Sequence, residues 1–388
     1  MIYRKLEDRH LNRYLDLLTD SKLGVLESTG EVHASLTDQT ISEKISNSRE
    51  QLNRIVGMTR EPKLITLKDE INRKSERVIK QLNNRDFDQL RKQDLTGLIL
   101  EAIIRTDGTR PSLFIKNGEV NLESASSGNW TDKLAVSKSL LEDAIACVGR
   151  IELGKSGQRF FGTGFLIHEN LIITNRHVLQ YLGFENEDGS WNLYEELSIN
   201  FGSEYQGLEK SRTREIVSLV YCGSEEIDFK SNPDHTKHDI AILALAPTNA
   251  DDLPKHFLSL DPNLEIKQGQ EFYSIGYPGR PGYLEYKQEI LDELFSGSYG
   301  FKKLAPGLSI PPQIALSEYS FAHDATVLHG TSGSPILLIG NEMTVAGIHY
   351  AGQPFFENWG HVISRILDTP NAKLGKTLRQ ILEEYDCI

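Results

Sequence analysis

Apolar residues recur at spacings of three and four over the first hundred residues of the chain. The first such series runs from Leu11 to Leu18, and three more cover residues 41–56, 71–82 and 95–103. This period places the apolar side chains on one face of an α-helix, where they can pack against other helices. We therefore expect four helices that share one core.

The pattern changes beyond residue 112. Apolar residues alternate on both sides of Asn117-Gly118, a pair that favours a tight β-hairpin near residues 112–123. A serine-rich stretch and a helical pattern over residues 134–146 come next. Short apolar runs typical of strands fill most of the remaining chain, and helical patterns return at residues 283–295 and 374–385.

These patterns divide the chain into two parts. We expect a mainly α-helical domain over residues 1–140, which includes the hairpin, and an all-β domain over residues 141–388. A chain of 388 residues is long enough for two hydrophobic cores. The predicted fold class is therefore α+β and multidomain.

Composition narrows the possible partners. The net charge is −13 and the acidic excess lies in residues 141–388, which argues against nucleic acid because phosphate binding requires clustered cations. No apolar run approaches the ~20 residues that span a bilayer, and the first residues lack the apolar core of a signal peptide. We expect a cytoplasmic protein that contacts no membrane. Its three cysteines lack the spacing of a metal site or a disulfide framework.

Three short motifs carry the candidate chemistry. Residues 329–335 read His-Gly-Thr-Ser-Gly-Ser-Pro, which places Ser332 between two glycines that allow a tight turn. Upstream, Thr-Asn-Arg-His ends at His177, and Asp239 precedes an apolar run. A serine hydroxyl becomes a good nucleophile when a base takes its proton and a third group orients that base. We predict Ser332 as nucleophile, His177 as base and Asp239 as the orienting acid.

The order His, Asp, Ser resembles that of the trypsin-like, chymotrypsin-fold serine peptidases, and in particular their disulfide-free bacterial branch. The resemblance covers about the last 245 residues. It implies two six-stranded β-barrels, cleavage of protein or peptide substrates, and no cofactor or metal. It also implies that the N–H groups of Gly330 and Ser332 bind the oxyanion.

Thr331 departs from trypsin, where an aspartate at this position pairs with a new N-terminus after cleavage. A threonine cannot form that ion pair, so activation should not depend on trimming. We expect the N-terminal helical domain to regulate activity or to bind a protein partner. This layout resembles that of bacterial effector proteases in defence or conflict systems.

The resemblance assigns the substrate pocket to Thr326, His349, Gly352 and Gly360. Thr326 stands where trypsin has an aspartate, so a preference for Lys or Arg is not expected. The sequence around His349 is similar to that of glutamyl endopeptidases, in which this histidine helps to bind the substrate carboxylate, but Val327 stands where those enzymes have a second polar pocket residue. We expect a small or apolar P1 residue, and an acidic P1 residue is the alternative.

Two other functions fit parts of the sequence. The domain could be a catalytically inactive protease fold that binds peptides, although the complete set of candidate catalytic residues argues against this. Residues 149–156 match the spacing of a Walker A phosphate loop. That motif needs a strand before it and a helix after it, whereas these residues themselves have the pattern of a strand.

Overall fold

The protein is described here by a computed structural model of the 388-residue chain. The structure describes residues 6–19, 35–59, 62–122, 128–154, 159–208, 212–228, 233–248, 254–279, 300–327, 330–338, 343–353, 357–371 and 373–388. The helix predicted at 283–295 lies outside these ranges.

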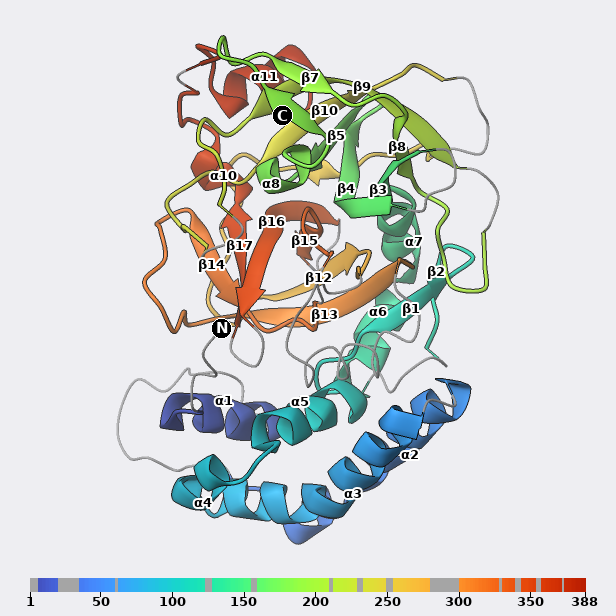
Figure 1. The fold of residues 1–388 in the computed structure, drawn as a ribbon, viewed down its shortest axis with the longest axis vertical. Coiled ribbons are helices and arrows are strands. Elements are labelled where there is room, and N and C mark those ends of the chain that lie inside the picture. The colour runs from blue at the N-terminus through green and yellow to red at the C-terminus, as the bar shows by residue number, and fades with distance from the viewer. Residues whose placement is uncertain are drawn as a thin grey trace.

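Five helices form one end of the molecule (Figure 1), and we call them the helical unit. They are α1 (Asp8–Thr19), α2 (Asp38–Thr59), α3 (Pro62–Asn83), α4 (Phe87–Lys92) and α5 (Thr96–Thr106). Their apolar faces share a core that includes Leu11, Leu52, Ile71 and Ile99, each fully buried. The four predicted helical series correspond to α1, α2, α3 and α5, so the mainly helical N-terminal region is confirmed.

Six strands form the first barrel. They are β3 (Val148–Leu153), β4 (Arg159–His168), β5 (Leu171–Thr174), β8 (Leu197–Asn200), β9 (Thr213–Cys222) and β10 (Ala241–Leu245). The antiparallel order β10-β5-β4-β3-β8-β9 closes on itself. Between β5 and β8 lie α8 (Arg176–Leu179) and a small hairpin of β6 (Gly183–Glu185) and β7 (Trp191–Leu193).

A second ring of six strands packs beside the first. They are β12 (Glu271–Gly276), β13 (Lys303–Ile310), β14 (Ser320–His323), β15 (Pro335–Leu338), β16 (Thr344–Gln353) and β17 (Glu357–Val362). All neighbouring pairs are antiparallel, and the β12–β13 pairing closes the ring. The chain ends with the helices α10 (Ile363–Ile366) and α11 (Leu378–Glu384). The predicted double six-stranded barrel is confirmed.

Three short strands extend the sheet of the second barrel. Strand β1 (Leu113–Lys116) pairs with β13 and with β2 (Glu119–Val120). Strand β11 (Ser259–Leu260) runs parallel to β16. The hairpin that the sequence predicts next to the helices therefore belongs to the sheet of the second barrel (Figure 1).

The hydrophobic cores divide the chain between Ile104 and Leu113. Residues from Leu113 onward pack with the barrels, including those of α6 (Thr131–Val136) and α7 (Lys138–Ala146). The helix predicted over 134–146 is thus two helices, which meet at Ser137. The domain boundary near residue 140 stays a prediction.

One buried ammonium group joins the two barrels. Lys302 is fully buried and precedes β13, and its Nζ donates to the carbonyls of Ile145 (2.7 Å) and Phe201 (2.9 Å). Oε1 of the buried Glu204 lies 3.8 Å away. Burial lowers the pKa of Lys302 to about 8, although Glu204 acts in the opposite direction. This lysine links α7, the end of β8 and the start of β13.

We expect Lys302→Met to lower the free energy of unfolding by about 3–5 kcal/mol at pH 7, because it leaves the buried Glu204 carboxylate without its cation.

The effect of this variant should also depend on pH. Above about pH 8 the folded wild type has released the Lys302 proton, whereas the unfolded chain keeps it until near pH 10.5. Between pH 8 and about 10.5, the free energy of unfolding of the wild type should therefore rise by about 1.4 kcal/mol per pH unit relative to that of the variant. Denaturant unfolding at pH 7, 8, 9 and 10 measures this; parallel pH curves for the two proteins would contradict it.

Candidate active site

His177 and Asp239 come together because the strands beside them pair. His177 lies in α8, three residues after Thr174 ends β5, and Thr174 pairs with Ala241 at the start of β10. This register brings Asp239 beside His177. The imidazole Nδ1 of His177 lies 2.6 Å from Asp239 Oδ2, and the His177 backbone N–H donates to Oδ1 at 2.8 Å. Both carboxylate oxygens are thus bound to one residue.

The Asp239 carboxylate is ionised although it is buried. The residue is only 3 % exposed. Burial by itself raises the pKa of Asp239, but the charge and the hydrogen bonds of His177 outweigh it, so the pKa lies below its ordinary value. An aspartate in this state can orient an imidazole and stabilise its protonated form.

The second barrel supports Asp239 through a histidine that we did not predict for this role. The Asp239 N–H donates to Nε2 of His361 at 3.2 Å. Nε2 is therefore an acceptor, and the proton of the ring is on Nδ1, which lies 3.0 Å from Ser320 Oγ. Burial lowers the pKa of His361 to about 3, so the ring stays neutral. No sequence motif indicates this contact, because β17 meets the Asp239 loop only in the folded chain.

Ser332 lies on a turn that binds to β4. The carbonyl of Ser332 accepts a hydrogen bond from the Thr163 N–H at 2.8 Å. A Cβ built on Gly162 would lie 3.0 Å from that carbonyl oxygen and 2.7 Å from Cγ2 of Val178, the residue after His177. The nucleophile turn and the helix that carries the candidate base therefore flank Gly162.

The hydroxyl of Ser332 and the imidazole of His177, both within the described ranges, do not form a hydrogen bond with each other. Hydrogen bonds of this kind are often long without substrate and tighten when it binds. The arrangement is a paired acid and base with the serine turn next to them.

The backbone of the nucleophile turn needs glycine at two positions. Gly330 and Gly333 have φ of 87° and 88°, a region that other residues rarely adopt. A Cβ on Gly330 would lie 2.3 Å from Gly279 N, and one on Gly333 would lie 2.0 Å from Thr163 O. Among the described residues, the N–H groups of Gly330 and Ser332 find no acceptor. These are the two donors predicted for the oxyanion.

The predicted pocket residues have different surroundings. Thr326 is buried, and its Oγ1 donates to the carbonyl of Arg110 at 2.6 Å. His349 is buried, and its Nδ1 lies 3.2 Å from Nε2 of His323. Gly352 is exposed beside Asn358.

Gly360, the fourth predicted pocket residue, is covered by the ring of Phe321. A Cβ on Gly360 would lie 2.7 Å from Phe321 Cε1, and one on Gly347 would lie 3.1 Å from the same atom. The ring therefore lies over both glycines. We did not predict Phe321 from the sequence, since it belongs to no motif.

Comparisons with known proteins agree with this geometry. A family model described as "Trypsin-like peptidase domain" matches residues 162–348. A protein of Lysobacter enzymogenes named "Probable serine protease" is 28 % identical over 283 residues, which are 68 % of this chain and 72 % of that protein. Residues 162–348 therefore form a trypsin-like peptidase domain. Its enzyme class is serine endopeptidase, as the three motifs predict.

Among solved structures, neuropsin, a serine protease expressed in the limbic system of mouse brain, is 15 % identical to this peptidase. The match has a TM-score of 0.40 and covers 57 % of this chain and 92 % of neuropsin.

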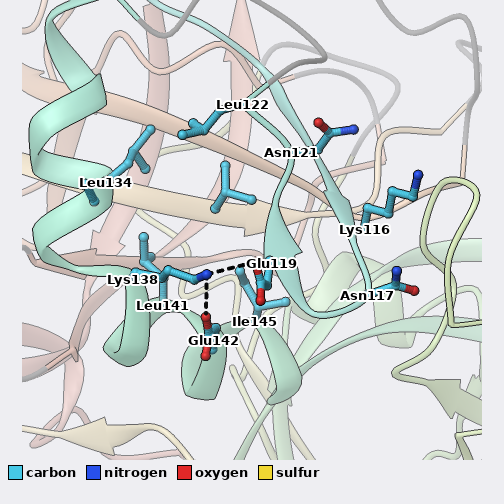
Figure 2. A pocket seen from close by; sticks show the side chains of 12 residues that line it. Lys116, Asn117, Glu119, Asn121, Leu122, Leu134, Lys138, Leu141, Glu142 and Ile145 are labelled. Carbon is cyan, nitrogen blue, oxygen red and sulfur yellow. Dashed lines mark ion pairs between the residues drawn. The ribbon is translucent and has the colours of Figure 1, made fainter.

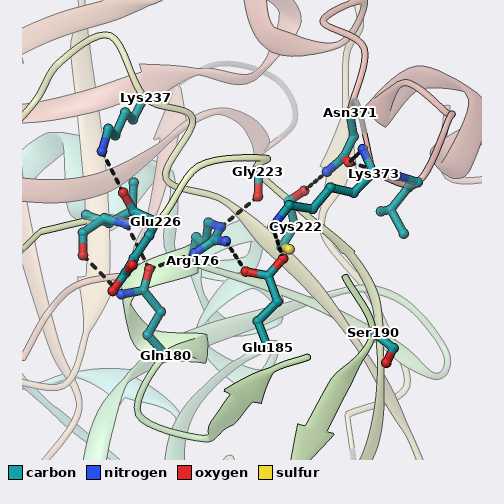
Figure 3. A network of polar contacts seen from close by, with 12 residues as sticks. Arg176, Gln180, Glu185, Ser190, Cys222, Gly223, Glu226, Lys237, Asn371 and Lys373 are labelled. Carbon is teal, nitrogen blue, oxygen red and sulfur yellow. Dashed lines mark hydrogen bonds and ion pairs between the residues drawn. The ribbon is translucent and has the colours of Figure 1, made fainter. Parts of the chain in front are cut away.

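A buried arginine fixes the helix that carries His177 in the peptidase. Arg176 is 1 % exposed, and its guanidinium donates to Gly223 O (2.7 Å), Gln180 Oε1 (2.8 Å) and Glu185 Oε2 (2.9 Å). Figure 3 shows that these contacts continue through Glu185 to Lys373 near the C-terminus. The network joins α8, the loop after β9 and the end of the chain.

A cavity of about 530 Å³ lies away from these residues, between the hairpin β1–β2 and the helices α6 and α7 (Figure 2). Leu134, Leu141 and Ile145 line its apolar part, and Lys138 pairs with Glu119 (2.9 Å) and Glu142 (3.7 Å) at its edge. It shares no lining residue with the loops of His177, Asp239 and Ser332.

The phosphate-loop alternative has no support in the described ranges. Residues 149–153 of the Walker-like match lie in β3, and the next element is the strand β4 rather than a helix. Lys155 and Ser156 lie outside the described residues. Where residues are described, the chain has no group of three or more His, Cys, Asp or Glu side chains that could bind a metal, and none of its helices is long and apolar enough to cross a membrane.

We expect Arg176→Met to lower the free energy of unfolding by about 3–5 kcal/mol, because it leaves the Gly223 carbonyl without its donor and the Glu185 carboxylate with only the half-exposed Lys373 as a cation. Arg379 is the matched control, since it binds Asp368 with two hydrogen bonds on the surface. Arg379→Met should cost less than about 1 kcal/mol. Denaturant unfolding of the three proteins measures both effects; equal losses in the two variants would rule out a special role for the Arg176 network.

Proposed function

We propose that this peptidase cleaves peptide bonds through a triad of His177, Asp239 and Ser332. The observation that carries the proposal is the double hydrogen bond between His177 and the buried Asp239 carboxylate, next to the Ser332 turn. This is the arrangement of base and orienting acid that serine catalysis requires.

In the proposed reaction, Ser332 Oγ attacks the carbonyl carbon of the scissile bond while Nε2 of His177 takes its proton. The bond between carbon and nitrogen then breaks, and His177 gives the proton to the leaving amine. A water molecule, deprotonated by His177, attacks the acyl carbon; the bond from this carbon to Ser332 Oγ then breaks, and His177 returns the proton to Oγ as the acid product leaves. Asp239 stays ionised throughout and stabilises the imidazolium.

The N–H groups of Gly330 and Ser332 would bind the oxyanion of each tetrahedral intermediate. The positive φ of Gly330 supports this role, because the N–H direction depends on a conformation that a side chain at residue 330 would prevent. Loss of one such donor typically costs ~3 kcal/mol of transition-state stabilisation.

For the P1 residue, the surroundings of the pocket favour a small or apolar side chain. The Phe321 ring fills the space above Gly347 and Gly360. His349 would be the ligand of an acidic side chain, but its partner His323 is fully buried, and burial lowers the pKa of His323 to about 3. The pair therefore gains no positive charge from His323 at neutral pH.

The helical unit is proposed to regulate the enzyme or to bind a protein partner in the cytoplasm. All three cysteines are free thiols, of which Cys147 and Cys222 are buried, and this suits a reducing compartment. A role as a bacterial defence or conflict effector rests on the analogy of domain layout.

Ser332→Ala should abolish peptide turnover and labelling by a fluorophosphonate probe, because no other group would accept the acyl or phosphonyl unit. Asp239→Asn should reduce kcat by about 10⁴-fold through loss of the correct His177 tautomer. Labelling detected by mass spectrometry and turnover of a peptide library measure both effects. A wild-type protein that binds peptides but is neither labelled nor active would instead be a non-catalytic peptide-binding module.

Phe321→Ala should enlarge the pocket and increase kcat/KM for a large apolar P1 residue relative to alanine by about tenfold or more, as expected for added apolar contact. Steady-state kinetics with matched peptides that differ only at P1 measure this ratio. A wild-type preference for glutamate at P1 would show that the acidic alternative is correct.

A further inference from the structure

A buried ion pair connects the segment that leaves the helical unit with the segment that leads to Ser332. We call residues 107–112, between α5 and β1, the exit segment. Arg110 Nε donates to Asp324 Oδ1 and Arg110 Nη2 donates to Oδ2, both at 2.8 Å. The side chains are 8 % and 0 % exposed. Two parallel hydrogen bonds of this kind fix distance and orientation together.

The remaining polar groups of this pair are also bound. Asp324 Oδ1 accepts from the N–H of Leu308 at 2.8 Å, and the Asp324 N–H donates to the Leu308 carbonyl at 3.2 Å. Arg110 Nη1 donates to Thr109 O at 2.7 Å. The guanidinium carbon lies 5.8 Å from the centre of the Trp130 ring. A pair so fully satisfied has one stable geometry.

The exit segment also binds the predicted pocket directly. Thr326 Oγ1 donates to the carbonyl of Arg110 at 2.6 Å, and Thr326 stands six residues before Ser332. Between these contacts, the Ala325 carbonyl accepts from Nδ2 of Asn358 on β17 at 2.9 Å. Residues 324–326 are therefore fixed on one side by β17 and on the other by the exit segment.

We propose that Arg110 is a positioning residue for the substrate pocket: it fixes Asp324 and Thr326, so the pocket reaches its working shape only when the exit segment is in place. This rests on the proposed function for its effect on cleavage. The minimal active enzyme then begins before Arg110 rather than near residue 140. Lysine cannot replace the planar fork that binds both carboxylate oxygens.

The first test measures hydrogen exchange in the full-length protein and does not require activity. The amides of Asp324 and Val327 are hydrogen-bonded in the structure. We expect Arg110→Met to increase exchange in the peptide that carries residues 320–327 by about tenfold, because the opening free energy of a segment depends on its local contacts.

Arg214→Met is the matched control, because Arg110 and Arg214, taken as whole residues, are both 6 % exposed. Arg214 Nη2 binds Asn170 Oδ1 (2.6 Å) and Ala246 O (2.7 Å) in the first barrel. This variant should leave exchange in residues 320–327 unchanged. Unchanged exchange in Arg110→Met, or an equal increase in both variants, would overturn the proposal.

The second test compares two reactions of Ser332. We expect Arg110→Met to lower kcat/KM for peptides by about ten- to a hundredfold, mostly through KM, as for small displacements of positioning groups. Fluorophosphonate labelling should fall much less, since the small probe does not need the pocket. Arg110→Lys should lie between wild type and Arg110→Met.

The two hypotheses fail in different ways. If the wild type is not labelled, the proposed function fails, while the exchange result still decides whether Arg110 fixes residues 324–326. If the wild type is active and Arg110→Met has the same KM and kcat, the positioning role is wrong. A loss of peptide turnover that matches the loss in Arg214→Met at equal thermal stability would also overturn it.

Discussion

The contact between the nucleophile turn and strand β4 is the constraint on which the rest of the site depends. The Thr163 N–H binds the Ser332 carbonyl, and the Thr163 carbonyl accepts from Thr174 Oγ1 at 2.7 Å, three residues before His177. Gly333 lies so close to Thr163 O that no side chain fits there. One residue of β4 therefore binds both the turn of the candidate serine and the strand end that precedes the candidate base.

Buried polar groups take the place of covalent cross-links in this peptidase. Its three cysteines are free, and the segments around the site are joined instead by Arg176, Lys302 and the Arg110–Asp324 pair. Such groups are costly to bury and costly to leave unpaired. They specify one arrangement of the loops because any other leaves a charge or a carbonyl without a partner.

The sequence predicted the elements that depend on local pattern. The helical unit followed from apolar residues at helical spacing, and the strands around His177 and Asp239 followed from short apolar runs. Long-range partners left no such signal. Arg110 and Asp324 are 214 positions apart, and the contact of His361 with Asp239 joins β17 to a loop of the other barrel. The sequence around Phe321 indicates only a strand, and its ring lies over Gly360 because β14 pairs with β17.

By itself the sequence determined the class of chemistry, because nucleophile, base and acid must be particular residue types in motifs that local backbone rules recognise. It also determined where the helical part of the chain ends and the strands begin, since apolar residues recur at a different spacing in helices and in strands. Only the tertiary structure decided that the hairpin after the helices completes the sheet of the second barrel, and that the exit segment contacts the pocket. Those contacts depend on which surfaces meet when the two barrels form, and no local sequence pattern indicates which distant residues will be in contact.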